Sequence, residues 1–467
     1  MLTISGQRHG MTRRYFLTAG SLGFSGLSLA SLMQVRAASD SPEPAVTGRS
    51  VIYVFQQGGP SQFETFDPKI DAPDAIRTVT DTIPTKLPGV AFGSTMKRLA
   101  GLADKLTIVR SFQTRNAGHN IQPIVGPDSL QANIGTHYAR VVGATHPRTG
   151  MPTNAVLYPS SVNKEVPGPS ARGNLASTGD WPSAYAPFTP GAKGDLQKDM
   201  QLKLPTDRFF DDRRTILSQL DNLNREVDSS GQLKAIDDLQ QQAYDLLLGG
   251  GVARALDLTQ EDPRTLARYD TSSYVTSHNW RQVSRGRAGY YTAQARTIGP
   301  LLCLARRLCE VGCGFVTIHA GYAGVWDMHA DGNNLNMTDG MQAVGASFDH
   351  AVAAFIEDLE SRGLQDDIML VASGEMGRTP KINKRGGRDH WARLAPLLMY
   401  GGGLAGGRVI GQSTRDGGEP ATENLTPTHL ISTILRTVFN VGQLRVMPSV
   451  PPQVLKLAAA DPIPGIR

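Results

Sequence analysis

The segment from Gly374 to Trp391, GEMGRTPKINKRGGRDHW, places charged side chains and glycines directly after the apolar run DIMLVAS. Glycines in a helix or strand cost backbone entropy, and unpaired charges do not enter a core. This composition next to a buried strand therefore predicts a functional site rather than another structural element. The segment's candidate chemistry-bearing residues are Glu375, Arg378, Arg388, Asp389 and His390.

A second polar loop, GYAGVWDMHADGNNLN, follows the apolar run CGFVTIHA. Within it, Asp327 and His329 are two residues apart, and in an extended loop such side chains point the same way. With Glu375, Asp389 and His390, they offer carboxylate and imidazole ligands without a thiolate. This ligand set suits zinc or manganese, and its acids leave magnesium or calcium open. The sequence therefore predicts a divalent-metal site, with the number of ions open.

The same residues also have a structural interpretation. His390 fits a loop residue that binds a backbone carbonyl. Asp327 and Glu375 fit structural ion pairs with the arginines of these segments. Arg378 and Arg388 equally suit an anionic ligand, because a guanidinium offers bidentate donors. The sequence leaves both interpretations open.

Strands that alternate with helices must position these loops. Apolar runs rich in β-branched and aromatic residues predict strands at 51–57, 106–112, 153–159, 313–320, 367–374 and 395–402. Helical spacing predicts helices at 129–142, 288–312, 341–359 and 428–440, and a helical insertion at about 206–249. This alternation is typical of a mostly parallel, doubly wound α/β sheet with helices on both faces. Ligands bind beyond the carboxyl ends of such strands, so we expect the polar loops to meet at one edge.

The N-terminus predicts an export signal. Arg13 and Arg14 precede an apolar, Gly/Ser-rich run, and the stretch that ends at Ala37 fits a small-residue cleavage site. The pattern resembles a twin-arginine signal, which implies the twin-arginine export machinery as a partner and a periplasmic or secreted location. The apolar run is too short for a membrane span, so no stable span is expected after cleavage. We expect a signal at 1–37, a linker at 38–50 and an α/β domain at 51–467.

Composition excludes other classes of protein. Hydrophobic residues make up 40% of the chain and charged residues 19%, which excludes wholesale disorder. Removing the four arginines of residues 1–37 from the 47 basic residues leaves 43, against 42 acidic residues. This near-neutral balance gives no support for a nucleic-acid partner. Cys303, Cys309 and Cys313 stand close together, which predicts buried packing rather than a disulfide framework.

The stretches VFQQGGPSQFETFDPK, GVWDMH and SGEMGRTPKINKRGGRDHW, with the twin-arginine leader, resemble the domain of unknown function 1501 family. That family comprises exported bacterial proteins related to the alkaline-phosphatase and sulfatase superfamily. The resemblance covers the mature chain and implies an alkaline-phosphatase-like α/β/α sandwich with a divalent-metal centre at the strand ends. It implies Asp327 and His329 as one pair of metal ligands. It also implies Glu375 and His390 as ligands from the later loops.

The chain departs from the pattern of the family and its superfamily at three places. The phosphatases place an Asp-His pair after a late strand, where this chain has Gly374 and Glu375. The first glycine-rich loop of the family commonly carries a His and an Asp, where this chain has Gln62 and Glu64. Glu64 remains a candidate ligand, whereas a glutamine replaces imidazole poorly. The superfamily's nucleophile stands at the start of the helix after the second strand. The matching stretch QTRNAGHN offers Thr114 and His119 as candidate catalytic residues and no clear nucleophile.

These observations predict an exported, divalent-metal-dependent hydrolase of phosphate or sulfate esters, acting on a small-molecule or polysaccharide ester. In this interpretation Arg378 or Arg388 stabilises negative charge on the ester oxygens. Thr114, or water activated by the metal, attacks. The alternative is a non-catalytic, metal-stabilised protein that binds an anionic polysaccharide or another envelope ligand.

Overall fold

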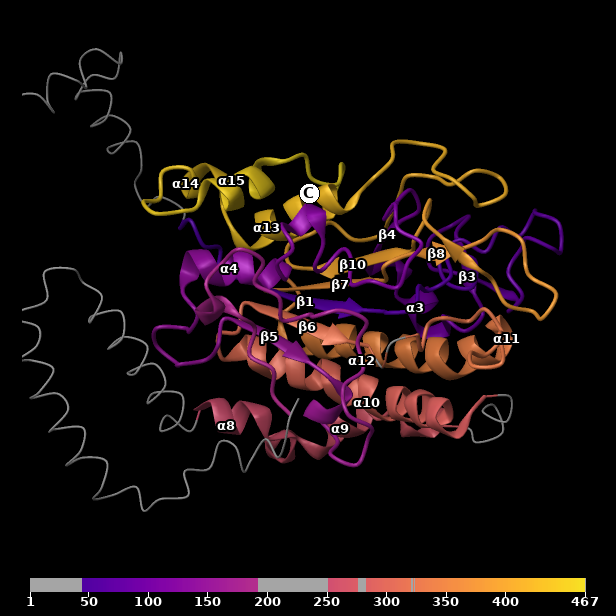
Figure 1. Cartoon of the computed structure of the whole chain (residues 1–467), viewed down its shortest axis with the longest axis horizontal. Coiled ribbons are helices and arrows are strands. Elements are labelled where there is room, and N and C mark those ends of the chain that lie inside the picture. Colours follow the sequence, from indigo (N-terminus) through magenta and orange to yellow (C-terminus); the bar gives the residue numbers. More distant parts are fainter. Residues whose placement is uncertain (1–43, 192–250, 276–282, 321, 323, 467) are drawn as a thin grey trace, which may run out of the picture. The chain divides into compact units, whose positions relative to one another are not determined.

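A seven-stranded sheet forms the centre of the structure, a computed structural model (Figure 1). In spatial order its strands are β11 (Arg408–Ile410), β4 (Thr107–Val109), β10 (Leu397–Gly401), β7 (Ile368–Ser373), β1 (Ser50–Phe55), β6 (Phe315–His319) and β5 (Asn154–Leu157). Within this sheet β10 alone is antiparallel to its neighbours, β7 and β4, and the other pairs are parallel. The predicted α/β fold with a mostly parallel sheet is confirmed.

The structure describes residues 44–191, 251–275, 283–320, 322 and 324–466. Ala45–Arg467 forms a compact unit. The expected export signal, the expected insertion at 206–249 and residues 38–43 of the expected linker lie outside the described residues. No helix in the described ranges is both long enough and apolar enough to cross a membrane.

Each central strand is buried on both faces, as β1 illustrates. Ile52 and Val54 point into one apolar cluster, while Val51, Tyr53 and Phe55 point into the other. The first cluster is closed by α3 (Lys97–Gly101), α8 (Gly251–Leu256), α10 (Arg285–Glu310) and α12 (Ala346–Arg362). The second is closed by α4 (Ile134–Val142), α13 (Pro427–Val438), α14 (Val441–Leu444) and α15 (Pro452–Ala459). Because successive side chains of a strand point to opposite faces, both faces of the sheet are apolar and covered by helices, which gives a helix–sheet–helix sandwich.

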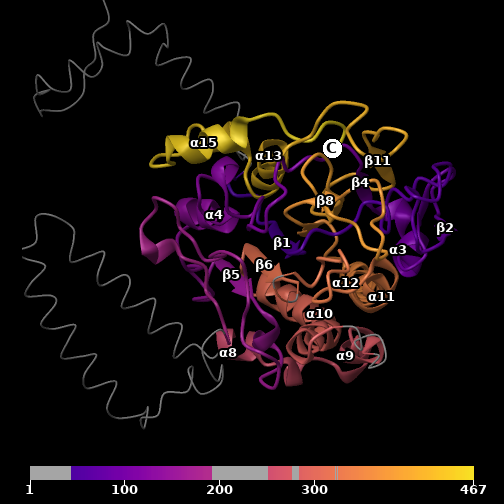
Figure 2. The same ribbon diagram turned by 45° about the vertical axis from the view of Figure 1, so that its right-hand side comes forward.

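The remaining helices are short. α9 (Pro263–Arg268) lies, together with α8, on the side of α10 away from the sheet (Figure 2). α11 (Met337–Gly340) leads through a π-helical turn, η8 (Met341–Gly345), into α12. Single 3₁₀ turns complete the helical segments: η1 (Ala103–Lys105), η2 (Pro127–Ser129), η3 (Pro159–Ser161), η4 (Ser183–Tyr185), η5 (Leu258–Gln260) and η6 (Ser272–Tyr274).

Side-chain caps set several helix ends. Asn133 accepts a hydrogen bond from the Gly135 amide at the start of α4, and Ser284 accepts one from the Arg287 amide at the start of α10. α12 ends at Gly363, whose φ of 71° is the left-handed conformation that glycine adopts readily. α4 begins at Ile134 rather than at the expected Ser129, because Leu130 has a left-handed backbone conformation that ends the preceding 3₁₀ turn.

Two small antiparallel ribbons were not predicted from the sequence. They are β2 (Thr82–Pro84) with β3 (Ala91–Gly93), and β8 (Gly377–Arg378) with β9 (His390–Trp391). Each strand has two or three residues, which is too short for an alternating pattern. The three cysteines are buried and free, as expected from their spacing.

Candidate metal centre

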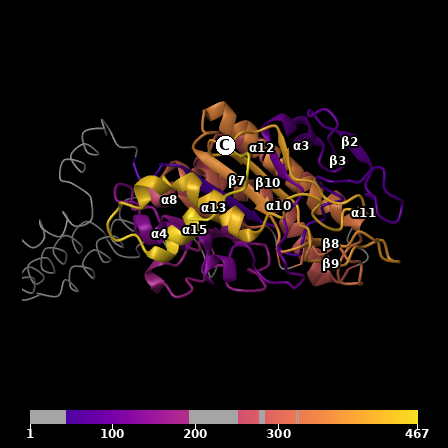
Figure 3. The same cartoon turned by 90° about the horizontal axis from the view of Figure 1, so that it is seen from above.

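Five segments meet at the edge of the sheet where β1, β4, β6 and β7 have their carboxyl ends. The loops after these strands carry Gly58, His119, Asp327 and Glu375. β10 runs the other way, so its amino end lies at this edge and the preceding β9 brings His390 there. Figure 3 shows β8 and β9 at the same end of the sheet as α11. The polar loops therefore meet as predicted.

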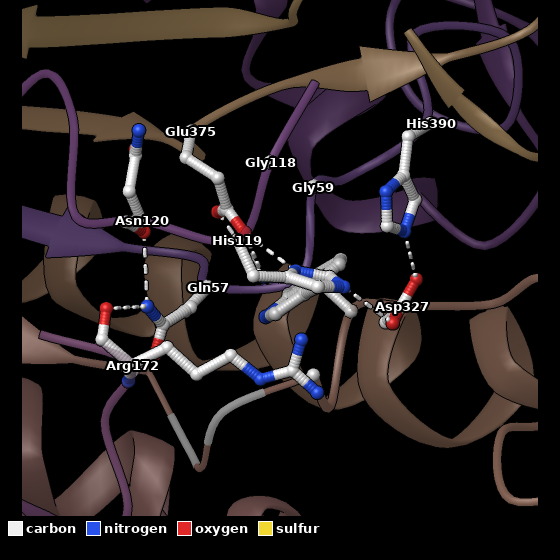
Figure 4. A network of polar contacts seen from close by, with 12 residues as sticks. Gln57, Gly59, Gly118, His119, Asn120, Arg172, Asp327, Glu375 and His390 are labelled. Carbon is white, nitrogen blue, oxygen red and sulfur yellow. Dashed lines mark hydrogen bonds and ion pairs between the residues drawn. The ribbon is translucent and has the colours of Figure 1, made fainter. Parts of the chain in front are cut away.

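Asp327 is the centre of this group. Its Oδ2 atom lies 2.8 Å from His119 Nε2 and 3.1 Å from His329 Nε2. Its Oδ1 atom lies 3.1 Å from His390 Nε2 and 2.9 Å from Arg378 Nη2 (Figure 4). The Asp327 side chain is almost fully buried. His119, Asp327 and His390 each offer a ligand atom, and these atoms all lie within 4.8 Å of one another.

Both ring nitrogens of His119 and of His390 face hydrogen-bond acceptors. His119 Nδ1 lies 3.1 Å from Glu375 Oε1, and His390 Nδ1 lies 3.0 Å from the Ala117 carbonyl oxygen. Both of these partners are acceptors, and so is the Asp327 carboxylate that faces each Nε2. A neutral ring carries one N–H and can donate to only one of its two acceptors. The other nitrogen then faces an acceptor without a proton between them, and this contact repels unless a cation binds there or the ring is protonated.

The charges around Asp327 shift two pKa values. Burial raises the pKa of Asp327, but the three histidines within hydrogen-bonding distance of its carboxylate and the charge of Arg378 outweigh it and hold the pKa well below its usual range. Burial lowers the pKa of His119, but hydrogen bonds and charges from Asp327 and Glu375 outweigh it and raise the pKa. Asp327 is therefore an anion at neutral pH, and His119 takes up a proton readily when no other cation is near.

Glu375 lies behind His119 rather than beside Asp327. Its buried carboxylate accepts hydrogen bonds from the Gly58 amide, at 2.9 and 3.1 Å, and contacts His119 Nδ1. Gly58 is required there, because a Cβ atom would lie 2.6 Å from the Asp327 backbone nitrogen. The structure thus gives this predicted ligand the role of orienting a histidine.

His329 has a second neighbour besides Asp327. Its Nε2 atom lies 3.1 Å from Asn334 Nδ2. Arg287 donates to Asn334 Oδ1 at 3.1 Å, which fixes the amide so that its N–H groups face His329. His329 Nε2 has one lone pair, which can accept from Asn334 or bind an ion but cannot do both at once.

Arg378 and Arg388 are buried among acceptors. Arg378 donates to Asp327 and to the carbonyl oxygens of Gly58 and Gly59, at 2.8 Å for the last. Arg388 pairs with Glu64 at 3.0 Å and donates to four further carbonyls. Both guanidinium groups are 0% exposed, so their hydrogen bonds hold loops together.

Other candidate residues lie away from Asp327. Glu64 is fully buried in its pair with Arg388, and Gln62 accepts from the Arg378 amide at 2.9 Å. Thr114 is buried with its hydroxyl 3.5 Å from the Asn116 carbonyl oxygen, and Asp389 is exposed beside Asn383. Of the predicted site residues, the structure brings Asp327, His329, His390, His119, Glu375 and Arg378 together.

Two polar residues of the site were not predicted from the sequence. Gln57 is fully buried at the end of β1 and joins two site loops through its amide. Asn334 orients His329. The paired glutamines before the first glycines were a usable signal for Gln57, because a buried strand end rarely carries an amide without a partner.

A helix–sheet–helix sandwich with a carboxylate–imidazole group beyond its strand ends defines an α/β protein with a candidate metal centre. The chain belongs to the family described as "Protein of unknown function (DUF1501)", whose sequence model matches residues 48–445. This confirms the resemblance seen in the sequence. A search of curated proteins found no match.

Solved structures that resemble the chain at low identity include a sulfatase, a phosphonate monoester hydrolase and an alkaline phosphatase. A sulfatase from a Pseudoalteromonas species is 11% identical, with 88% of this chain and 71% of that chain covered and a TM-score of 0.36. The phosphonate monoester hydrolase of Silicibacter pomeroyi is 12% identical, with 83% and 72% covered and a TM-score of 0.32. Alkaline phosphatase from the Antarctic bacterium TAB5 is 10% identical, with 83% and 98% covered and a TM-score of 0.30.

Proposed function

We propose that the protein is an exported, divalent-metal-dependent hydrolase of phosphate or sulfate esters. One observation carries the proposal: His119 and His390 both turn Nε2 toward Asp327 while their Nδ1 atoms face acceptors. Metal-binding histidines in proteins are oriented in this way. The group supplies nitrogen and oxygen ligands, which suit zinc or manganese, and leaves magnesium or calcium open.

Some of these residues would hold the metal ion, and others would orient its ligands. His119, Asp327 and His390 would hold the ion, with His329 as a further ligand on the Oδ2 side. Glu375 and the Ala117 carbonyl keep the Nδ1 protons of their histidines in place. Arg378 keeps the Asp327 carboxylate charged and fixed. A divalent ion held there would polarise an ester oxygen or lower the pKa of a bound water.

Elemental analysis of the folded protein, run with aryl phosphate and aryl sulfate assays, tests the proposal. We expect bound divalent metal, turnover of at least one ester, and loss of turnover with a chelator. His390→Ala is expected to lose both metal and turnover while it stays folded. His350→Ala is the control, because His350 binds the Arg268 carbonyl and Tyr274 rather than this group. Metal-free protein that stays metal-free after incubation with each ion would reject the site.

A metal-stabilised binding protein remains the second candidate, for a specific reason. Among the described residues, no serine, threonine or cysteine side chain hydrogen-bonds to His119, Asp327 or His390. A covalent route through Thr114 would need a rearrangement of its buried hydroxyl. Tight metal binding without turnover of either ester would favour this second function.

Export belongs to the same proposal. It rests on the paired arginines at the N-terminus and on the small-residue site that ends at Ala37. Replacing Arg13 and Arg14 by lysine is expected to trap the full-length chain in the cytoplasm. Cell fractionation of the two chains measures this, and unchanged export of the lysine variant would contradict twin-arginine targeting.

A further inference from the structure

Arg172 differs from the two buried arginines of the site because its side chain is exposed and its guanidinium has no partner among the described residues. The guanidinium groups of Arg378 and Arg388 donate hydrogen bonds to carboxylates and backbone carbonyls. Within the part of the chain that the structure describes, no hydrogen bond or ion pair involves the Arg172 guanidinium, and its backbone atoms are engaged instead. Its five donors are therefore available to a ligand.

The backbone of Arg172 is held to the site by Gln57. Gln57 Oε1 accepts from the Arg172 amide at 2.9 Å, and Gln57 Nε2 donates to the Arg172 carbonyl at 3.2 Å. The same Nε2 donates to the Asn120 carbonyl at 3.0 Å, next to His119. Gln57 is fully buried and its Oε1 also lies 3.1 Å from His319 Nε2. One buried amide thus couples the Arg172 loop to the His119 loop.

A second contact holds these two loops together. Gly173, with a φ of 129°, lies so close to Ile121 that a Cβ atom would be 2.9 Å from that side chain. The Arg172 position is therefore fixed on two sides, which an arginine needed only for solubility does not require. In Figure 4 its side chain extends from this anchor toward the part of the site that holds His119 and Asp327.

We propose that Arg172 binds the tetrahedral oxyanion of the ligand, the phosphate or sulfate group, beside the metal centre. This inference rests on the proposed function. A guanidinium matches two oxygens of such a group with parallel hydrogen bonds, and these charge-assisted bonds are stronger than neutral ones. Arg172 then decides which ligands bind, while His119, Asp327 and His390 hold the ion.

Calorimetric titration of the metal-loaded protein with inorganic phosphate, and separately with inorganic sulfate, tests the assignment. Arg172→Ala is expected to weaken anion binding by about tenfold or more. Arg172→Lys is expected to weaken it by less, since a lysine keeps the charge but lacks the paired donors of a guanidinium. Metal content is expected to stay unchanged in both variants. The anion that wild-type protein binds more tightly identifies the ester class.

Arg264→Ala is the matched control, because Arg264 is an exposed arginine on α9 with no part in the site. Equal anion affinity in wild type and Arg172→Ala, with metal retained, would overturn this inference and leave the proposed function standing. The same holds for wild-type protein that keeps its metal and binds neither anion. Wild-type protein without metal would overturn the proposed function and this inference with it.

Discussion

The histidines of the site show what a residue pattern can and cannot predict. The sequence indicated Asp327, His329 and His390 because carboxylate and imidazole side chains recur after apolar runs. It could not separate a residue that binds an ion from one that orients a ligand. That difference lies in which atoms face each other, as in the 3.1 Å contact between Glu375 and His119 Nδ1. A sequence records residue types and not the directions of side chains.

Replacing Glu375 by glutamine tests the orienting role. Glutamine keeps the size of the side chain but accepts the Nδ1 proton of His119 less strongly. We expect metal affinity to fall by about 10-fold to 100-fold while the ion still binds, as for other partners of metal-binding histidines. Competition with a chromogenic chelator measures this affinity. A complete loss of metal would instead indicate that Glu375 is itself a ligand.

The raised pKa of His119 predicts opposite pH trends with and without metal. A metal ligand must lose this proton, so affinity should fall about tenfold per pH unit below that pKa. In the metal-free protein, the stabilisation from protonated His119 is fully present below its ordinary pKa of 6.5 and is lost as pH rises through the raised value. Melting temperatures across pH, measured with chelator and with metal, should therefore diverge as pH rises. Parallel curves would contradict the assignment.

At the scale of elements, the direction of β10 decides whether the site is complete. Its apolar run predicted a strand correctly, but apolar composition carries no information on direction. Because β10 is antiparallel to β7, it begins at the edge of the sheet where β7 ends. The segment between these strands, which carries Glu375 and His390, therefore stays at that edge. The short ribbons and β11 were missed because strands of two or three residues show no periodicity.

The buried pair between Glu64 and Arg388 connects the loop after β1 to the segment that enters β9. Glu64→Ala leaves a fully buried guanidinium without its carboxylate, so we expect a loss of about 3–5 kcal/mol in the free energy of unfolding. Denaturant unfolding measures it. The folded fraction should keep the wild-type metal content. A lower metal content in that fraction would restore Glu64 as a ligand, and Glu423→Ala, at an exposed acid, is the control.

At the scale of the whole molecule, the layered α/β architecture followed from the alternation of apolar runs. The clusters on the two faces of β1 confirm that alternation. The site draws on segments from the whole length of the unit, so metal should bind the folded chain far better than the unfolded one. At 100 times the dissociation constant, such binding adds about 2.7 kcal/mol to the free energy of unfolding. Calorimetry with metal and with chelator should show the higher melting temperature with metal, and His390→Ala should abolish the difference.

The place of β10 between β7 and β4 has a consequence for biosynthesis. All five segments at the metal centre leave the ribosome before β10, yet β4 has no partner on that side until Leu397–Gly401 is made and inserted. A chain that stops short of Gly401 carries every proposed ligand but lacks the strand that joins the two parts of the sheet. Retention of metal would thus report that β10 has been made and has joined the sheet.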